Sequence, residues 1–133
     1  MVLFDSSVWV AFFNQNDIHH EKAQELFIEA TQQKEIITVP EFVYAEVLNS
    51  LWRITNKEDE IERCKNVFLQ GTPIIQLELG GSKFWYQTIE SVMKKVSLKT
   101  SDLIVASTIV YYQSQRFETF DRILQREVDK LSL

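Results

Sequence analysis

Short apolar runs alternate along this chain with longer segments of helical periodicity. Residues 2–4 form an apolar run that ends at a polar turn, residues 19–33 carry apolar side chains at helical spacing, and residues 35–39 form a second apolar run ended by Pro40. Strand, helix and strand in this order predict a βαβ unit. Because crossovers of this kind are nearly always right-handed, the alternation favours an open parallel sheet with helices on both faces.

The same alternation continues to the end of the chain. Further helical patterns cover residues 40–54, 57–69, 82–96 and 101–113. Further strands are predicted over residues 73–77 and 116–120, and residues 128–133 could add a short edge strand. Gly80 and Gly81 mark a turn after the third strand. We therefore predict one α/β domain over residues 1–133.

Composition restricts the class of protein. A length of 133 residues with 45% hydrophobic residues suits one compact domain. Cys64 is the only cysteine, so neither a disulfide framework nor a thiolate zinc site can form within one chain. The first residues lack the basic segment of a signal peptide, and no apolar run approaches the roughly 20 residues that span a bilayer. A soluble, cytoplasmic protein without a membrane partner is expected.

The formal net charge of −5 argues against a protein that coats nucleic acid by neutralising its phosphates. The argument weakens if four carboxylates cluster to hold metal, because they would account for most of this charge and a divalent ion would offset part of the cluster. Net charge therefore leaves an RNA partner open.

Four acidic residues occupy positions that a parallel sheet would bring to one edge. Asp5 and Asp121 each follow an apolar run directly, whereas Glu46 lies inside an apolar helix soon after Pro40 and Asp102 lies in the first turn of another helix. In open parallel sheets, ligands bind beyond the carboxyl ends of the strands. We expect the four carboxylates to meet there.

Carboxylate oxygens without histidine or cysteine ligands suit Mg²⁺ or Mn²⁺ better than zinc. Such an ion lowers the pKa of a bound water and neutralises charge that develops on a phosphoryl oxygen, so phosphodiester hydrolysis is the matching reaction. Carboxylates packed this closely repel one another. In the absence of metal, one of them is therefore expected to hold a proton with a raised pKa.

Four segments carry a family resemblance: LFDSSV at residues 3–8, PEFVYAEV at residues 40–47, TSDLIVA at residues 100–106 and TFD at residues 119–121. In order and spacing, over nearly the whole chain, they resemble the PIN domain, and most resemble the VapC toxins, the ribonuclease halves of bacterial and archaeal toxin-antitoxin pairs. The resemblance implies a parallel sheet with strand order 3-2-1-4-5, a Mg²⁺ or Mn²⁺ site, RNA as substrate, a homodimer and inhibition by a small antitoxin protein.

By matching position, the resemblance implies a set of catalytic metal ligands, acting directly or through water: Asp5, Glu46, Asp102 and Asp121. It also implies supporting polar roles for Ser7 and Thr119. The chain departs from the usual family ending, where an aromatic residue often follows the last aspartate by three positions and a further acidic residue can come sooner. Leu124 and Ile123 stand at these positions, so Asp121 is the one late acid assigned to the site.

The candidate acids also have structural interpretations. Asp102 in the first turn of a helix is favourable through the helix dipole, and Asp121 could equally be an N-cap. Glu46 is harder to explain in this way, because a carboxylate inside an apolar helix must be solvated, paired or metal-bound. Glu41, a rival near the same helix start, is explained by the helix dipole.

Candidates for RNA contact are weaker, since cations near helix ends are favourable without any ligand. They are Lys94, Lys95, Lys99, Arg116 and Arg122. The adjacent His19 and His20 are interpreted as surface residues. Trp9, Phe12 and Phe13 are interpreted as core or dimer contacts rather than as base-stacking platforms.

Two other function classes compete with a ribonuclease. A Mg²⁺-dependent phosphohydrolase or a receiver-type domain also places acids at the ends of parallel strands. The phosphohydrolase would need a second acid two residues after Asp5, where Ser7 stands, and neither fold predicts Glu46 inside the second helix. A non-catalytic PIN-like scaffold that binds RNA or a partner is the other alternative, and the presence of all four acids counts against it.

Overall fold

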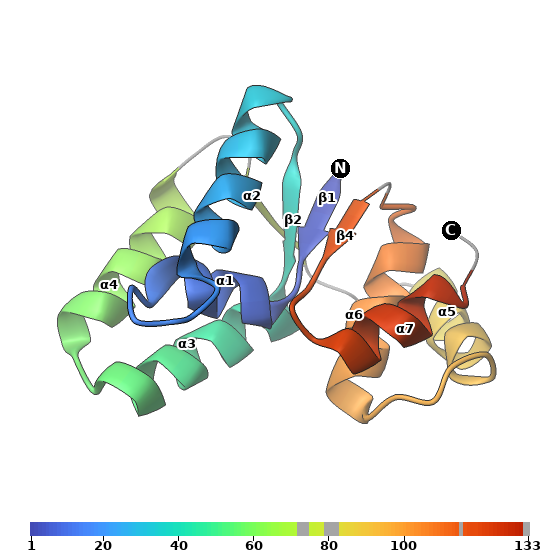
Figure 1. The fold of residues 1–133 in the computed structure, drawn as a ribbon. Helices are drawn as coiled ribbons and strands as arrows, with labels where there is room; N and C mark the ends of the chain where they lie inside the picture. Colours follow the sequence, from blue (N-terminus) through green and yellow to red (C-terminus); the bar gives the residue numbers. More distant parts are fainter. Residues whose placement is uncertain (72–74, 79–82, 115, 132–133) are drawn as a thin grey trace.

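Four parallel strands form the centre of the structure. The structure, a computed structural model, describes residues 1–71, 75–78, 83–114 and 116–131. The strands are β1 (Val2–Phe4), β2 (Ile37–Pro40), β3 (Ile75–Glu78) and β4 (Arg116–Glu118). They lie in the order β3-β2-β1-β4, and each neighbouring pair is parallel (Figure 1). The predicted parallel sheet is confirmed.

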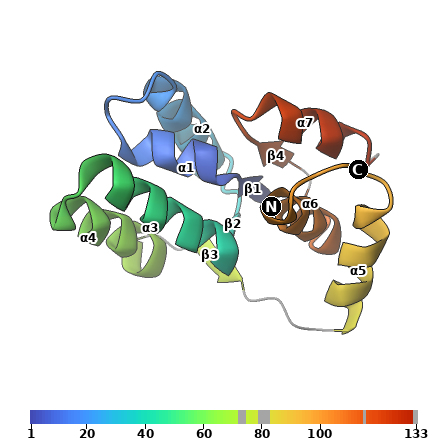
Figure 2. The ribbon, with the colours of Figure 1, turned by 90° about the horizontal axis from the view of Figure 1, so that it is seen from below.

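Helices cover both faces of this sheet, as Figure 2 shows along the strand direction. One face carries α1 (Ser6–Phe13), α2 (His20–Gln32), α3 (Glu41–Thr55) and α4 (Glu58–Asn66), and the other carries α5 (Lys83–Met93), α6 (Thr100–Tyr111) and α7 (Arg122–Asp129). A π-helical turn, η1 (Val67–Gly71), extends α4. This two-sided cover explains why every residue of β1 and β2 is buried, instead of alternating with solvent-exposed residues.

Trp9 on α1 is the centre of an aromatic cluster in the core. Its ring centroid lies 5.5 Å from that of Phe4 on β1 and 4.8 Å from that of Phe68 on η1. Trp9 is fully buried. Replacing a buried aromatic residue with alanine typically lowers the free energy of unfolding by about 3–5 kcal/mol. This cluster therefore contributes strongly to the packing of α1 against the sheet and the end of α4.

Helix α1 is an element that the periodicity does not predict. Four of its eight residues are buried: Val8, Trp9, Ala11 and Phe13. The remaining apolar residues, Val10 and Phe12, are partly buried and pack against the same core. The segment therefore lacks the polar stripe by which an amphipathic helix is recognised in a sequence.

The predicted fifth strand over residues 128–133 is wrong within the described residues. The chain remains helical in α7 up to Asp129, and Lys130 and Leu131 form a turn, while residues 132–133 lie outside the description. Leu124 and Val128 are buried at a helical spacing of four. The described sheet therefore has the order β3-β2-β1-β4 rather than 3-2-1-4-5.

The other predicted elements are present with shifted ends. Strand β2 begins at Ile37 rather than at residue 35, and β4 ends at Glu118 rather than at residue 120. The predicted turn at Gly80 and Gly81 and the start of the predicted third strand at residues 73–74 lie outside the described residues. No described helix has the length and apolar content needed to cross a bilayer.

Candidate metal centre

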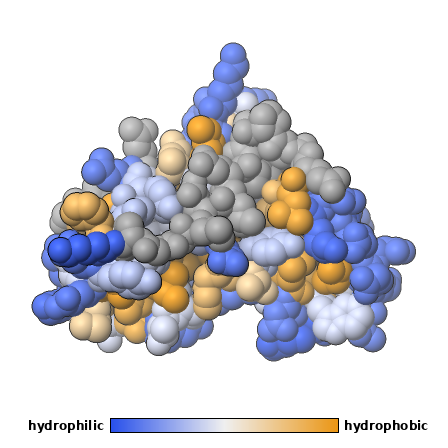
Figure 3. All heavy atoms as spheres, turned by 180° about the vertical axis from the view of Figure 1, so that it is seen from behind, coloured by the Kyte–Doolittle hydropathy of each residue, from blue (hydrophilic) through white to orange (hydrophobic). Residues whose placement is uncertain are grey.

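A cavity of about 330 Å³ opens at the carboxyl edge of the sheet. Residues of α1 and α3 line it from one side, and residues of α6 and of the segment before α7 line it from the other. Figure 3 shows from behind that the molecule is notched between these two groups of helices. The structure brings the four candidate acids together, because all of them line this cavity: Asp5, Glu46, Asp102 and Asp121.

Asp5 is held at one carboxylate oxygen by two hydroxyl groups. It directly follows β1 and is 5% exposed. Ser7 Oγ donates to Asp5 Oδ2 at 3.0 Å, and Thr119 Oγ1 donates to the same oxygen at 2.9 Å. The two hydroxyl oxygens lie 3.3 Å apart. The carboxylate therefore has a fixed orientation, and both polar residues that the sequence singled out contact it.

The segment after β4 is tied to the same group of side chains. The Phe120 backbone N–H donates to Ser7 Oγ at 3.0 Å, and the Asp121 N–H donates to Thr119 Oγ1 at 3.0 Å. Asp121 Oδ1 accepts from the N–H groups of Ile123 at 2.9 Å and Leu124 at 3.1 Å. Asp121 is thus the N-cap of α7, and one carboxylate oxygen is enough for this structural role.

Glu46 and Asp102 approach the cavity from opposite faces of the sheet. Partial burial raises the pKa of Glu46 above its ordinary value, and the nearby carboxylates of Asp5 and Asp102 raise it further, against a hydrogen bond from Ser6 that lowers it. Burial also raises the pKa of Asp102. The raised pKa expected for this cluster is thus present at both carboxyl groups, with burial as its largest cause and repulsion between carboxylates as a smaller one.

Lys99 supplies positive charge to this cavity. Its Nζ lies 3.9 Å from Asp102 Oδ2 and lowers the pKa of that carboxyl, which partly offsets the effect of burial. Among the described residues that line the cavity, Lys99 is the only lysine or arginine. Several carboxylates therefore share one ammonium group, and the cavity holds an excess of negative charge.

The other basic candidates are not brought to this cavity. Lys94 pairs with Glu90 at 3.0 Å on the surface of α5, and Lys95 and Arg122 are exposed without lining the cavity. Arg116 stands at the start of β4, the strand end opposite to Thr119, where Glu29 and Glu35 pair with it at 3.3 and 2.8 Å. These acids hold Arg116 at the other edge of the sheet, away from the acidic cavity.

Several residues that line the cavity were not candidates in the sequence. They are Ser6, Val10, Asp17, His19, Ser50, Ile54 and Phe120. Ser50 follows Glu46 by one helical turn, so its place on the same face was readable from the sequence. Asp17 and His19 lie in the loop between α1 and α2, and their position could not be inferred without knowing that α1 is a helix.

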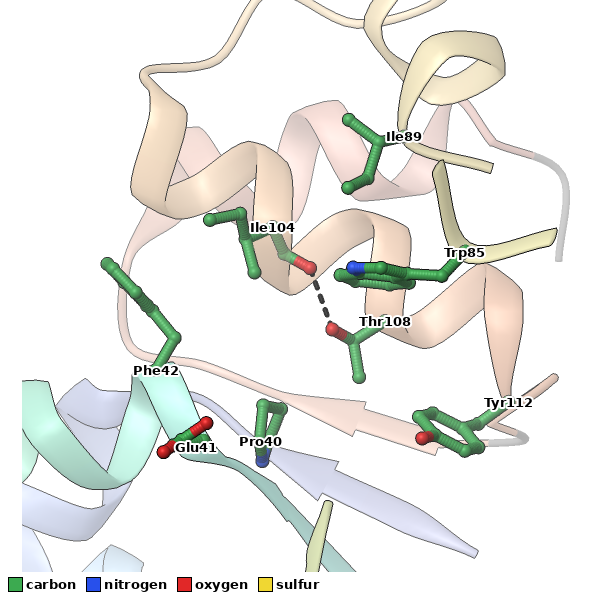
Figure 4. A pocket seen from close by; sticks show the side chains of 8 residues that line it. All are labelled: Pro40, Glu41, Phe42, Trp85, Ile89, Ile104, Thr108 and Tyr112. Atoms are coloured by element: carbon green, nitrogen blue, oxygen red, sulfur yellow. Dashed lines mark hydrogen bonds between the residues drawn. The ribbon is translucent and has the colours of Figure 1, made fainter. Parts of the chain in front are cut away.

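Glu41 belongs to a different cavity. It lies exposed at the start of α3, and together with Pro40 and Phe42 it borders an apolar cavity of about 190 Å³ against α5 and α6 (Figure 4). Glu41 does not line the acidic cavity. The structural interpretation of Glu41 in the first turn of α3 agrees with this placement.

The donor chemistry of the acidic cavity fits a hard divalent cation. Partly desolvated carboxylates from four segments face one volume, and oxygen donors of this kind are preferred by Mg²⁺ and Mn²⁺. As the side chains stand, no group of three or more His, Cys, Asp or Glu residues within the described ranges converges closely enough to hold one ion.

Comparisons with known proteins give a family and a fold. The sequence matches the model of the PIN domain over residues 2–131. The structure is similar to that of VapC20 from Mycobacterium tuberculosis, a toxin that cleaves the sarcin-ricin loop, with a TM-score of 0.76 and 16% identity, covering 95% of this chain and 94% of that one.

A second similar structure is VapBC2 from Rickettsia felis, bound to a DNA fragment from its promoter, with a TM-score of 0.65 and 17% identity, covering 96% of this chain and 93% of that one. No curated protein matches the sequence significantly. At these identities the two structures agree with this chain in fold, and the family match extends over nearly all of its residues. The chain therefore belongs to the PIN domain family.

Proposed function

We propose that this PIN domain is a metal-dependent endoribonuclease in which Asp5, Glu46, Asp102 and Asp121 hold Mg²⁺ or Mn²⁺. The observation that carries the proposal is the convergence of these four side chains, from four separate segments, on one cavity at the carboxyl edge of the sheet. Burying several carboxylates near one another is unfavourable without a partner cation. A fold that needed them only for stability would not gather them.

Asp5 and Lys99 would have different roles in such a reaction. A bound divalent ion would supply positive charge for the phosphoryl oxygens and lower the pKa of a bound water. Asp5, held by Ser7 and Thr119, would present its remaining oxygen in a fixed direction. Lys99, at the mouth of the same cavity, would bind a phosphate oxygen of the RNA as a point charge.

Protonation would compete with the metal at Glu46 and Asp102. Both carboxyl groups have a pKa above the ordinary value in the metal-free protein. An ion binds the deprotonated form, so metal binding would release protons from this pair.

The experiment that tests the nuclease is incubation of the purified protein, free of any partner, with structured RNAs in Mn²⁺, Mg²⁺ or EDTA. Cleavage is expected with metal and not with EDTA, and Asp5→Asn is expected to abolish it. Glu41→Gln is a matched control, since this acid is exposed and lies outside the acidic cavity. A protein that binds metal but leaves every RNA intact would favour the non-catalytic scaffold.

We further propose that the protein is the toxin of a type II toxin-antitoxin pair and acts as a homodimer. Its similarity in fold to VapC20 and VapBC2 supports this assignment. Expression in a bacterial host is expected to arrest growth, and Asp5→Asn is expected to relieve the arrest. Co-expression of a small protein encoded next to the toxin should also restore growth. Normal growth with well-folded wild-type protein would contradict the toxin role and leave the nuclease proposal standing.

A further inference from the structure

His19 and Phe120 form a stacked pair at the edge of the acidic cavity. Their ring centroids are 4.3 Å apart and their planes differ by 19°. Both side chains line the cavity that also contains the four candidate metal ligands. His19 is exposed, whereas Phe120 is half-buried. The pair therefore offers a flat ring to solvent, supported from behind by a second ring.

Two sets of hydrogen bonds fix this pair relative to the metal centre. The His19 backbone N–H donates to Asp17 Oδ1 at 2.8 Å, which orders the loop before α2. The Phe120 N–H donates to Ser7 Oγ at 3.0 Å, and this same hydroxyl donates to Asp5 Oδ2. The Ser7 side chain thus connects the aromatic pair to Asp5, one of the four candidate metal ligands.

Imidazole hydrogen bonding does not explain the position of His19. Its neighbour His20 has a structural contact, since its Nδ1 lies 2.7 Å from the Ala11 carbonyl oxygen. No described residue forms a hydrogen bond with the His19 ring. Its ring stacks on Phe120, and an exposed flat ring placed in this way is suited to stack on a further ring.

A nuclease that contacts only the phosphate backbone cannot distinguish one position along the RNA from the next, because every phosphate is alike. Stacking of a base on an aromatic side chain provides a fixed point, and it is tolerant of sequence because each base has a flat face. A base inside a helix is already stacked on its neighbours. Such a platform therefore selects single-stranded, looped or bulged nucleotides.

We propose that an unpaired nucleobase next to the scissile phosphate stacks on His19, with Phe120 as its support. The inference rests on the proposed nuclease function and names the side chains that position the substrate at that site. His19 and Phe120 determine the position of the substrate, and the ligands of the metal centre are separate from them.

The test is binding of a short single-stranded RNA that carries 2-aminopurine, measured by fluorescence in EDTA, so that no cleavage occurs. Stacking on an aromatic ring quenches this base. We expect wild-type protein to quench it, and His19→Ala to weaken binding about tenfold and remove the quenching. His19→Phe should retain both, because it keeps a flat ring without the imidazole nitrogens. Phe84→Ala is the matched control, an exposed aromatic residue that does not line the cavity.

The same variants in Mn²⁺ separate the two proposals. If His19→Ala raises KM about tenfold and leaves kcat nearly unchanged, while His19→Phe resembles the wild type, stacking is supported. If wild-type protein cleaves RNA but His19→Ala binds and quenches normally, the platform is wrong and the nuclease stands. If His19→Phe is as defective as His19→Ala, the imidazole itself acts and stacking is overturned. Wild-type protein that neither binds nor cleaves RNA would overturn both.

Discussion

Asp5 shows how much of the candidate site depends on contacts that no local sequence pattern contains. Its place after an apolar strand was predictable, and so was the arrival of Asp121 at the same edge. Family resemblance implied supporting polar roles for Ser7 and Thr119, but not that both donate to Asp5 Oδ2. Thr119 lies 114 residues from Asp5, so no local pattern relates the two. The positions of Asp17 and His19 at the cavity could not be predicted, because their loop follows α1, a helix that the periodicity does not reveal.

At Thr119, removing the hydroxyl group should weaken the metal site without unfolding the protein. Thr119→Val takes away a donor to Asp5 and an acceptor for the Asp121 N–H. Loss of a residue that orients a metal ligand typically reduces affinity or activity by about 10–100-fold. Titration calorimetry with Mn²⁺ measures this loss, and Thr119→Ser should restore most of the affinity. Equal affinity in Thr119→Val and wild type would show that Asp5 needs no such support.

At Glu46, removing the charge should stabilise the protein while removing its function. Burial and the carboxylates of Asp5 and Asp102 raise the pKa of Glu46, so its ionised form opposes folding at neutral pH. Glu46→Gln should therefore raise the melting temperature of the metal-free protein. The gain should stay below about 1 kcal/mol, because the group keeps contact with water. A lower melting temperature than that of the Glu41→Gln control would refute this.

At the scale of elements, α1 and α7 differ most from the sequence prediction. Helix α1 is buried on too many sides to show a helical pattern. Helix α7 is short, and its start depends on Asp121 as N-cap. The long amphipathic helices α2 and α3 were predictable because one face of each is polar. Helix α1 and the N-cap of α7 both line the acidic cavity, beside the predicted helices α3 and α6.

Helix α7 also contacts the segment that precedes Lys99 and Asp102, through a hydrogen bond between Glu127 and Ser97. Glu127 is 3% exposed; its Oε2 accepts from the Ser97 N–H at 3.0 Å and its Oε1 accepts from Lys130 Nζ at 2.6 Å. These contacts, led by the hydrogen bond from Lys130, lower the pKa of Glu127. The stability that Glu127 contributes is therefore present at neutral pH and is lost as the pH falls below its ordinary range.

Glu127→Gln should accordingly lower the melting temperature at pH 7 and change it little at acidic pH, where the wild-type carboxyl is protonated. Thermal unfolding across this pH range measures the effect. Glu25→Gln is a suitable control, because its carboxylate pairs with Lys22 on an exposed surface of α2. A difference between Glu127→Gln and wild type that does not vary with pH would contradict the assigned role.

For the whole molecule, the sheet separates two groups of helices whose charged side chains meet at one edge. Metal bound there would connect α3 on one face with α6 on the other and so stabilise the folded state as a unit. A ligand at 100 times its Kd adds about 2.7 kcal/mol to stability. For a domain of this size, that corresponds to a rise in melting temperature of about 10 °C.

Mn²⁺ should therefore raise the melting temperature of wild-type protein and of Glu41→Gln, and should have little effect on Asp5→Asn or Asp102→Asn. Differential scanning calorimetry with and without Mn²⁺ provides the measurement. The same rise in Asp5→Asn as in wild type would show that the ion binds elsewhere.

The most direct test of the proposed function is the single-turnover rate of RNA cleavage as a function of Mn²⁺ concentration, for wild type, Asp5→Asn and Glu41→Gln. The proposal predicts a rate that saturates with Mn²⁺, vanishes in EDTA, is unchanged in Glu41→Gln and falls more than about 100-fold in Asp5→Asn. Cleavage that persists in EDTA, or that is equally fast in Asp5→Asn, would contradict a metal centre built on these carboxylates.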